Sequence, residues 1–94
     1  MTIQERISEF ELCPIWITAN AFSQICRDDM FASLFRFRAG DWGEVSDSDR
    51  QANDEALVKG GRILATYSDR YSLKFWIITE SDRSATTIFL PGDY

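Results

Sequence analysis

The sequence has no histidine, only two cysteines and only two prolines. Without histidine the commonest general base is missing, and neither a Ser–His nor a Cys–His nucleophile pair can form within the chain. The two cysteines, Cys13 and Cys26, are too few for a zinc tetrahedron, and we interpret them as small buried hydrophobic residues that stay reduced. These absences argue against an enzyme, and we expect no catalytic residues, no metal and no cofactor.

Signals for membranes, secretion and phosphate binding are also missing. No run of apolar residues approaches the ~18 that a membrane-spanning helix needs, and residues 1–13 lack the basic start and apolar stretch of a signal peptide. The glycines of 40–43 and 60–61 lack the spacing of a phosphate-binding loop. The acids between 41 and 49 do not follow the calcium-loop pattern. We therefore expect a cytoplasmic protein that does not contact a membrane.

The length of 94 residues predicts a single domain, 1–94. A chain of this size buries about 65% of the surface that its unfolded form exposes, which is enough for one core without metal or disulfide support. Hydrophobic residues make up 45% of it, too many for a disordered chain.

The first half of the chain shows mainly helical periodicity. Residues 3–12 place Ile3, Ile7 and Phe10 near one helical stripe, and Pro14 ends that helix. Residues 15–19 are typical of a short strand, and residues 21–26 of a helical turn. A second helix is expected to begin at Asp28 as its N-cap and to end before Gly40.

A third helix is expected between Ser46 and the glycine pair at 60–61. On its helical wheel Ala52, Ala56 and Leu57 face the body of the protein. The opposite side carries four polar residues: Asp47, Gln51, Asp54 and Glu55.

The second half of the chain changes to strand periodicity. Residues 62–67, 73–79 and 84–90 are rich in β-formers, and the short connections between them predict an antiparallel meander. The middle strand, which contains Trp76, is apolar on both faces and is therefore expected to be central. The fold class is α+β, a two-layer domain with N-terminal helices packed on a three- to four-stranded antiparallel sheet. The expected core contains Phe31, Leu34, Phe35, Leu57, Phe75 and Ile77.

The net charge of −5 is concentrated in one segment. Residues 41–55 carry six acids against Arg50 alone, which gives −5, while the remaining residues hold nine acids and nine bases. Such a field can steer a basic partner or mimic a run of phosphates. Such a run of acids is equally typical of a solvated helix face, because the helix dipole stabilises acidic residues in the first turn. Both interpretations stay open on the sequence alone.

Direct nucleic-acid binding and carboxylate catalysis are weaker interpretations. Arginines near Phe31, Phe35 and Phe37 are compatible with single-strand binding, but phosphate repels a chain with this net charge, so those phenylalanines are expected in the core. The neighbouring acids Asp54 and Glu55 do not face each other on a helix, so they do not form an obvious catalytic pair.

Several short strings in residues 40–94 carry a resemblance. They are GDWG at 40–43, NDEAL at 53–57, FWIITE at 75–80, DRS at 82–84 with TT at 86–87, and LP with DY between 90 and 94. Together they resemble an uncharacterised group of small proteins of conjugative plasmids, phages and integrative elements, often mislabelled as restriction–modification subunits. The resemblance implies a mobile-element accessory protein and transfers no catalytic residue.

By analogy with other small acidic proteins of such elements, the resemblance implies an inhibitor of host nucleic-acid defence, of the anti-CRISPR or anti-restriction type. We predict that it acts as a DNA mimic by binding a host protein, such as a nucleic-acid-binding defence complex. The predicted partner-binding residues are Asp41, Trp42, Glu44, Asp47, Asp54 and Glu55. The alternative is a regulatory or structural interaction module that binds its partner through exposed aromatic residues.

Overall fold

A computed structural model describes residues 14–93 as four strands and three α-helices, followed by a short 3-10 helix. The elements follow the order β1 (Ile15–Ile17), α2 (Ala19–Gln24), α3 (Arg27–Arg38), α4 (Asp47–Lys59), β2 (Ile63–Ser68), β3 (Lys74–Thr79), β4 (Thr86–Phe89) and η1 (Pro91–Asp93). The helix expected over 3–12 and the residue Cys13 lie outside the described residues.

The sheet has four strands in the order β1-β4-β3-β2. Strands β2, β3 and β4 form the expected antiparallel meander, with β3 and its Trp76 between the other two. The expectation of a wholly antiparallel sheet was wrong, because β1 pairs with β4 in parallel, with Ile15 opposite Thr86 and Ile17 opposite Ile88. A short hairpin connection forces antiparallel pairing, whereas β1 reaches β4 after most of the chain has intervened.

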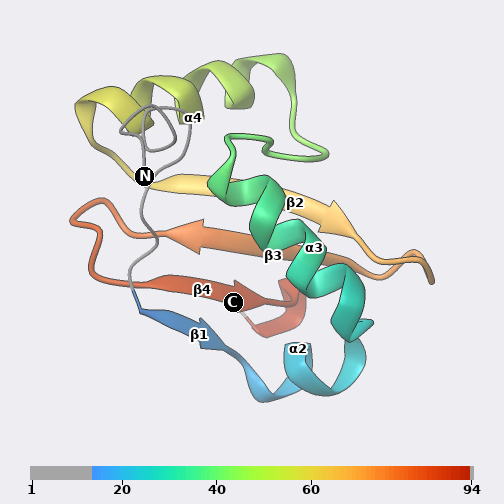
Figure 1. The fold of residues 1–94 in the computed structure, drawn as a ribbon. Helices are drawn as coiled ribbons and strands as arrows, with labels where there is room; N and C mark the ends of the chain where they lie inside the picture. Colours follow the sequence, from blue (N-terminus) through green and yellow to red (C-terminus); the bar gives the residue numbers. More distant parts are fainter. Residues whose placement is uncertain (1–13, 94) are drawn as a thin grey trace, which may run out of the picture.

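Figure 1 shows α3 crossing one face of the sheet, α2 beside the end of β1, and α4 along the edge strand β2. The chain end is tied to this arrangement by Asp93, whose carboxylate accepts hydrogen bonds from the Thr18 hydroxyl (2.6 Å) and the Asn20 amide (2.8 Å). Thr18 also caps α2 by accepting a hydrogen bond from the Ala21 N–H. The C-terminal turn therefore locks the first described helix in place.

The core lies between α3 and the covered face of the sheet. Met30, Leu34 and Phe37 are buried along α3, at a spacing that places them on one side of a helix. On the sheet they meet the inward residues of alternating positions, as the strand period requires. These are Ile63, Ala65, Tyr67, Phe75, Ile77 and Ile88.

Part of the predicted core was wrong. Phe31 and Phe35 are exposed. Helix α3 turns its Met30–Leu34–Phe37 side to the sheet, and each exposed phenylalanine follows a buried residue by one position, which rotates it about 100° away from that side. Leu57 is only half-buried at the edge of the core. Leu34, Phe75 and Ile77 are buried as expected.

The predicted helix ends are close to those observed. Ser46 caps α4 by accepting a hydrogen bond from the Asp49 N–H at 3.1 Å, and Gly60 is its C-cap. Helix α3 begins one residue before Asp28, with Cys26 at the N-cap position, so the Asp28 cap was wrong. Asp69 takes over part of this role, because its carboxylate accepts the Cys26 N–H at 2.9 Å.

We expect truncation of Phe75 to be costly. Its side chain is fully buried, so Phe75→Ala should lower the free energy of unfolding by about 3–5 kcal/mol through lost contacts and a cavity. Denaturant unfolding measures this. The matched control is Tyr71→Ala, at a ring that is 76% exposed, which should change stability by no more than about 0.5 kcal/mol. Equal effects at the two positions would contradict the core assignment.

Candidate protein interface

Helix α4 carries most of the acidic segment along the outer edge of the sheet (Figure 1). Asp47, Asp54 and Glu55 are exposed, as the sequence predicted. The expected inward face was partly wrong, because Ala52 is exposed and Asn53 is buried in its place. The Asn53 amide donates to the Leu64 carbonyl at 2.8 Å and accepts the Leu64 N–H at 3.2 Å, which explains why a polar residue faces inward.

Trp42 was predicted to bind a partner, but the structure buries it to 2% exposure. Its ring meets Phe37 edge-on, with 5.4 Å between the ring centroids. The indole Nε1–H donates to Asp54 Oδ1 at 2.9 Å, which satisfies the polar atom of a buried aromatic. Trp42 therefore anchors α4 to the core and is not part of the surface, and Asp54 has a structural duty besides its charge.

Asp41 is also committed to the fold. Its carboxylate pairs with the Arg36 guanidinium at 2.8 Å and accepts the Gly43 N–H at 3.1 Å. The hydrogen bond from Arg36 lowers the pKa of Asp41, and burial opposes that shift only in part. The Asp41 backbone carbonyl accepts the Tyr67 hydroxyl at 2.7 Å. Its negative charge is therefore balanced locally.

Residues 42–44 pair with the outer edge of β2. The Thr66 N–H donates to the Trp42 carbonyl at 3.2 Å, and the Glu44 N–H donates to the Thr66 carbonyl at 2.7 Å. Between them, Gly43 has a φ of +75°, and a Cβ there would lie 2.1 Å from the Thr66 carbonyl oxygen. The Glu44 carboxylate accepts the Ser68 hydroxyl at 3.0 Å. The close approach of Gly43 to the Thr66 carbonyl explains the second glycine of the GDWG string.

Arg83 secures the other end of α4, a role that the sequence analysis missed. Its guanidinium donates to the Ala56 carbonyl at 2.7 Å and to the Gly61 carbonyl at 2.6 Å. The Ala56 carbonyl also accepts the Gly60 N–H, so Arg83 is its second donor, and a cation at a helix C-terminus interacts favourably with the helix dipole. The isolated position of Arg83 in a hairpin loop gave no such signal, because its partners are more than 20 residues away.

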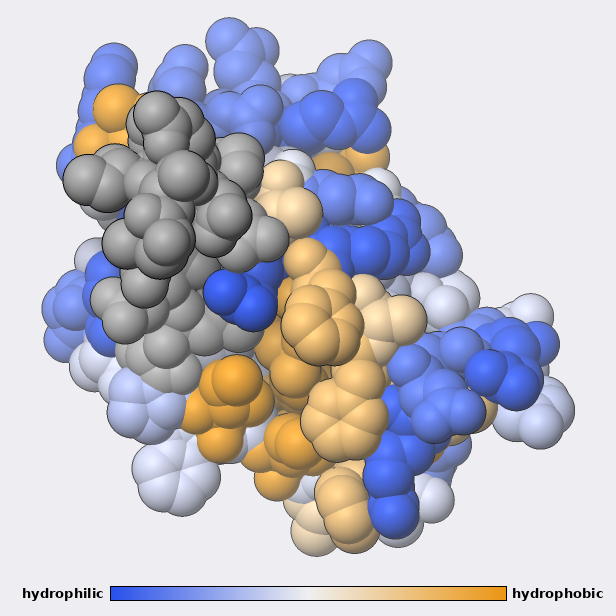
Figure 2. Space-filling view, in the orientation of Figure 1, coloured by the Kyte–Doolittle hydropathy of each residue, from blue (hydrophilic) through white to orange (hydrophobic). Residues whose placement is uncertain are grey.

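The carboxylates of α4 that make the fewest contacts with the rest of the fold are those of Asp47, Asp49 and Glu55. Asp47 pairs only with Arg50, three residues along the same helix, and both side chains are largely exposed. Asp49 and Glu55 are exposed, and neither carboxylate has a hydrogen bond within residues 14–93. Val58, on the outer side of the same helix, is 83% exposed. Hydrophilic residues dominate this end of the molecule in Figure 2.

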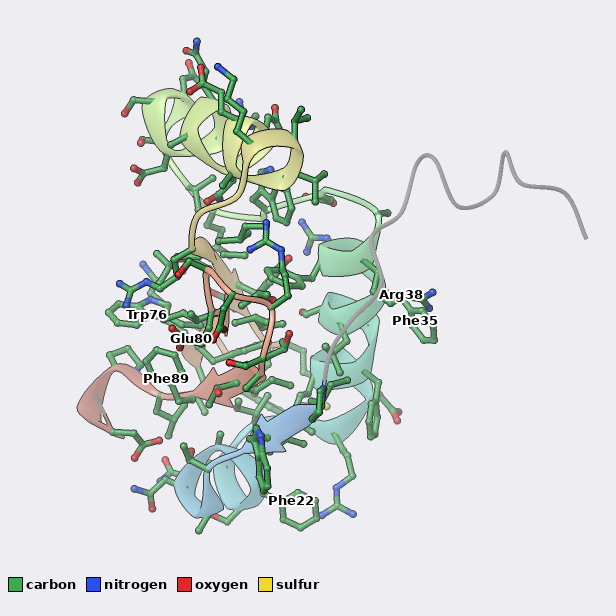
Figure 3. The ribbon with its side chains drawn as sticks, turned by 90° about the vertical axis from the view of Figure 1, so that its left-hand side faces the viewer. Phe22, Phe35, Arg38, Trp76, Glu80 and Phe89 are labelled. Atoms are coloured by element: carbon green, nitrogen blue, oxygen red, sulfur yellow. The ribbon has the colours of Figure 1, made fainter. Side chains whose placement is uncertain are left out.

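A second distinctive surface lies on α2 and α3. Phe22, Phe31 and Phe35 are 49%, 48% and 67% exposed, and we call these three residues the aromatic face. Figure 2 shows a band of hydrophobic side chains over these helices, and in Figure 3 Phe35 and Arg38 project from α3 away from the sheet. The Arg27 guanidinium lies 4.4 Å from the centroid of the Phe22 ring.

The opposite face of the sheet has its own aromatic pair. Trp76 and Phe89 meet edge-on at 5.4 Å between centroids, on neighbouring strands (Figure 3). Phe89 is buried and Trp76 is half-buried, so the two rings shield each other in part from solvent. Trp16, on the edge strand β1, is more exposed.

A polar pocket of about 230 Å³ lies between α3 and the loop after β2, lined in part by Asp29, Ser33, Asp69 and Arg70. Asp29 pairs with the Arg70 guanidinium at 3.0 Å, and Asp69 accepts the backbone N–H groups of Tyr71 and Leu73. Asp29 is therefore balanced by Arg70 and Asp69 by backbone N–H groups, and both acids hold the loop. Within the described residues no three cysteine or acidic side chains gather as a metal site, and no helix is long and apolar enough to cross a membrane.

Comparison of the chain with protein-family models, curated proteins and solved structures finds no match in any of the three. The resemblance to plasmid and phage proteins therefore stays a prediction. What the structure adds is a physical role for several of the matching strings. The GDWG and NDEAL strings meet in the Trp42–Asp54 hydrogen bond, and the DRS string supplies Arg83.

The adjacent acids Asp54 and Glu55 should behave differently when truncated. Asp54→Ala removes the acceptor of the buried Trp42 N–H, so the free energy of unfolding should fall by about 1–3 kcal/mol. Glu55→Ala removes an exposed charge and should change it by no more than about 0.5 kcal/mol. Urea unfolding of both variants tests this. Equal small effects would show that the Trp42–Asp54 bond does not hold α4.

Acid should weaken the loop contact made by Asp29. The hydrogen bond from Arg70 lowers the pKa of Asp29 from 3.8 to about 2, so the contact stabilises the fold above pH 3.8 and is lost as the pH falls toward 2. Asp29→Asn should therefore be less stable than wild type at pH 6, and the gap should close by about pH 2. Urea midpoints across this range measure it.

The control for this titration is Asp28→Asn, in the same helical turn. Asp28 has an exposed side chain and lies beside Asp29 in the chain. Asp28→Asn should change the free energy of unfolding at pH 6 by no more than about 0.5 kcal/mol. A pH-independent gap for Asp29→Asn would contradict the ionic contact with Arg70.

Proposed function

We propose that this protein is a non-enzymatic accessory protein of a mobile element that inhibits a host nucleic-acid defence system by binding one of its proteins. The interface is the outer side of α4, with Asp47 and Glu55 as its charged part, and the exposed Asp49 adds negative charge at the N-terminal turn of the same helix. The observation that supports it is the exposure of these three carboxylates, which the fold does not use to hold its core. Glu44 and Asp54 add negative charge from positions that also serve the fold.

The spacing of the acids suits a surface built to bind phosphates. Asp47 and Glu55 are eight residues apart, about 12 Å along a helix. That distance is the axial span of between three and four phosphates of one DNA strand, at about 3.4 Å each. A groove lined with lysine and arginine for a nucleic-acid backbone would therefore meet complementary charge on α4. The arrangement supports mimicry of a short length of nucleic acid.

The same helix offers an apolar contact as well as charge. Val58 lies within about 60° of Asp47 and Glu55 on the helical wheel and is largely exposed. Interfaces commonly combine a small apolar centre with a charged rim, and the rim acts mainly on the association rate. We infer that Val58 supplies the contact and that the carboxylates steer it into place.

The mobile-element context comes from the resemblance of residues 40–94 alone. The structure gives Trp42 and Asp41 internal roles, so we leave them out of the proposed contact surface. The remaining acids keep the sign and the position that the proposal needs. A host defence complex that binds DNA or guide RNA is the partner class that this chemistry favours.

The alternative function is an interaction module that binds through exposed aromatic residues. It is favoured by one observation, the exposure of Phe22, Phe31 and Phe35 on the aromatic face. Salt distinguishes the two proposals, because charge-driven binding weakens as ionic strength rises and apolar binding does not.

The function can be tested by displacement of DNA. Labelled duplex DNA is bound to a purified defence complex of the natural host, and the protein is titrated in while fluorescence anisotropy is recorded. Asp47→Asn with Glu55→Gln should displace DNA about tenfold less well at low salt, because two steering charges are lost. The deficit should shrink at high salt, where screening already weakens the wild type.

The matched control is Asp28→Asn with Glu80→Gln, which removes the same two charges from exposed sites outside α4. It should displace DNA as the wild type does. Thermal unfolding of both variants checks that neither loses its fold. If the wild type displaces no DNA from restriction or CRISPR complexes, or if both double variants lose activity equally, the α4 interface is wrong.

A further inference from the structure

We propose that the outer edge of β1 pairs with β1 of a second copy of this chain, in an antiparallel register centred on Trp16. The four strands of each copy would then form one continuous sheet. The inference does not depend on the proposed function of α4, because β1 is the edge of the sheet opposite to the one that α4 follows (Figure 1).

Strand β1 has outward backbone groups that no other described residue pairs. On its inner side the Pro14 carbonyl accepts the Thr86 N–H at 2.9 Å, and the Thr18 N–H donates to β4 at 3.1 Å. Successive residues of a strand alternate in direction, so the N–H and C=O groups of Ile15 and Ile17 point away from β4. The sheet has no further strand on that side, which leaves these groups available to another chain.

The two edges of the sheet are protected differently. At β2, residues 42–44 and the Asn53 side chain satisfy outward backbone groups. Among the described residues nothing comparable covers β1. Charged side chains and proline are other guards against pairing of edges. Residues 14–26 carry no charge, and Pro14 directs its backbone toward β4, so its missing N–H leaves no gap in an outer ladder.

An antiparallel register centred on Trp16 uses every outward group of β1. Ile15 would lie opposite Ile17 of the second copy, and each such pair exchanges both of its hydrogen bonds. Trp16 would lie opposite its own counterpart as a non-hydrogen-bonded pair, the arrangement in which side chains of neighbouring strands come closest. Aromatic pairs across strands stabilise a sheet, and no charge meets another of the same sign.

The apolar side chains at this end of the molecule are exposed. Ile15 is 42% exposed, Trp16 is 63% exposed, and Phe22 lies at the end opposite α4 in Figure 3. At roughly 200 Å² for a large side chain, the three leave about 300 Å² of apolar surface to cover on each copy. A stable interface of standard size covers about 800 Å² on each partner, so pairing through β1 gives a weak, concentration-dependent dimer.

The distribution of charge favours a second copy at β1. Each chain has a net charge of −5, so two copies repel each other wherever their acids come close. Pairing at β1 places the two β2 strands, with α4 beside each, seven strand spacings apart, about 34 Å. That distance is several times the screening length of about 8–10 Å in physiological salt. The uncharged edge is therefore where two copies meet with the least repulsion.

The test is sedimentation of the full-length protein at concentrations from about 1 μM to about 1 mM. The wild type should change from monomer to dimer within this range. Trp16→Lys should raise the dissociation constant at least tenfold, because the two new charges lie directly opposite each other. The matched control is Tyr71→Lys, the same change at an exposed ring in the loop after β2, which should associate as the wild type does.

A charge-swap pair separates loss of contact from loss of fold. Trp16→Glu should associate as poorly as Trp16→Lys when each is alone. In an equal mixture the two variants should bind each other about tenfold more tightly than either binds itself, because opposite charges then meet across the strands. Unfolded variants would show no such recovery.

Amide hydrogen exchange, followed by NMR, locates the contact on the backbone. Where about nine tenths of the protein is dimeric, the N–H groups of Ile15 and Ile17 should exchange about tenfold more slowly than in dilute protein, because they are bonded only in the dimer. The Trp16 N–H faces β4 in the monomer and should exchange at the same rate in both samples.

Three results would overturn the proposal. A wild type that stays monomeric to about 1 mM would leave the β1 edge to a strand of another protein. A dimer that Trp16→Lys does not weaken, or that leaves the exchange of Ile15 and Ile17 unchanged, would show that the copies meet elsewhere. A charge-swap mixture that associates no better than its components would show that the two Trp16 positions are not opposite each other.

Discussion

The outer edge of β2 is the constraint on which the rest of this small domain depends. An edge strand presents unpaired backbone N–H and C=O groups that invite pairing with another chain. Here Thr66 is paired on both its groups by residues 42–44, and Leu64 is paired on both its groups by the side chain of Asn53. The edge is sealed by the same residues that connect the sheet to α4.

That seal also fixes where the acidic helix lies. Asn53 and the neighbouring Asp54 hold α4 from one side, through Leu64 and the buried Trp42, and Arg83 holds its C-terminal end. A helix secured at these points keeps its remaining carboxylates on a rigid support, which a binding surface needs. The contacts that protect the sheet edge therefore also fix the position of the proposed interface. Asp47, Asp49 and Glu55 take no part in those contacts.

The two surfaces of the molecule act over different distances. The carboxylates of α4 produce a field that reaches about 8–10 Å in physiological salt, so they can influence a partner before contact. The aromatic face acts only on contact, where rings exclude water. Because the outer side of α4 is acidic and the aromatic face is apolar, the two surfaces would suit partners of different chemistry.

Sequence periodicity determined the local parts of this protein: the meander of β2, β3 and β4, the central place of Trp76, and the Ser46 cap of α4. The sequence also located the acids, because the position of each charged residue is read directly from it. Only the tertiary structure decided which helical face turned inward, leaving Phe31 and Phe35 exposed, and that β1 joined β4 in parallel. It alone showed that Trp42 is buried against Asp54. Local hydrogen bonds and period follow from neighbouring residues, whereas these choices depend on which distant surfaces meet.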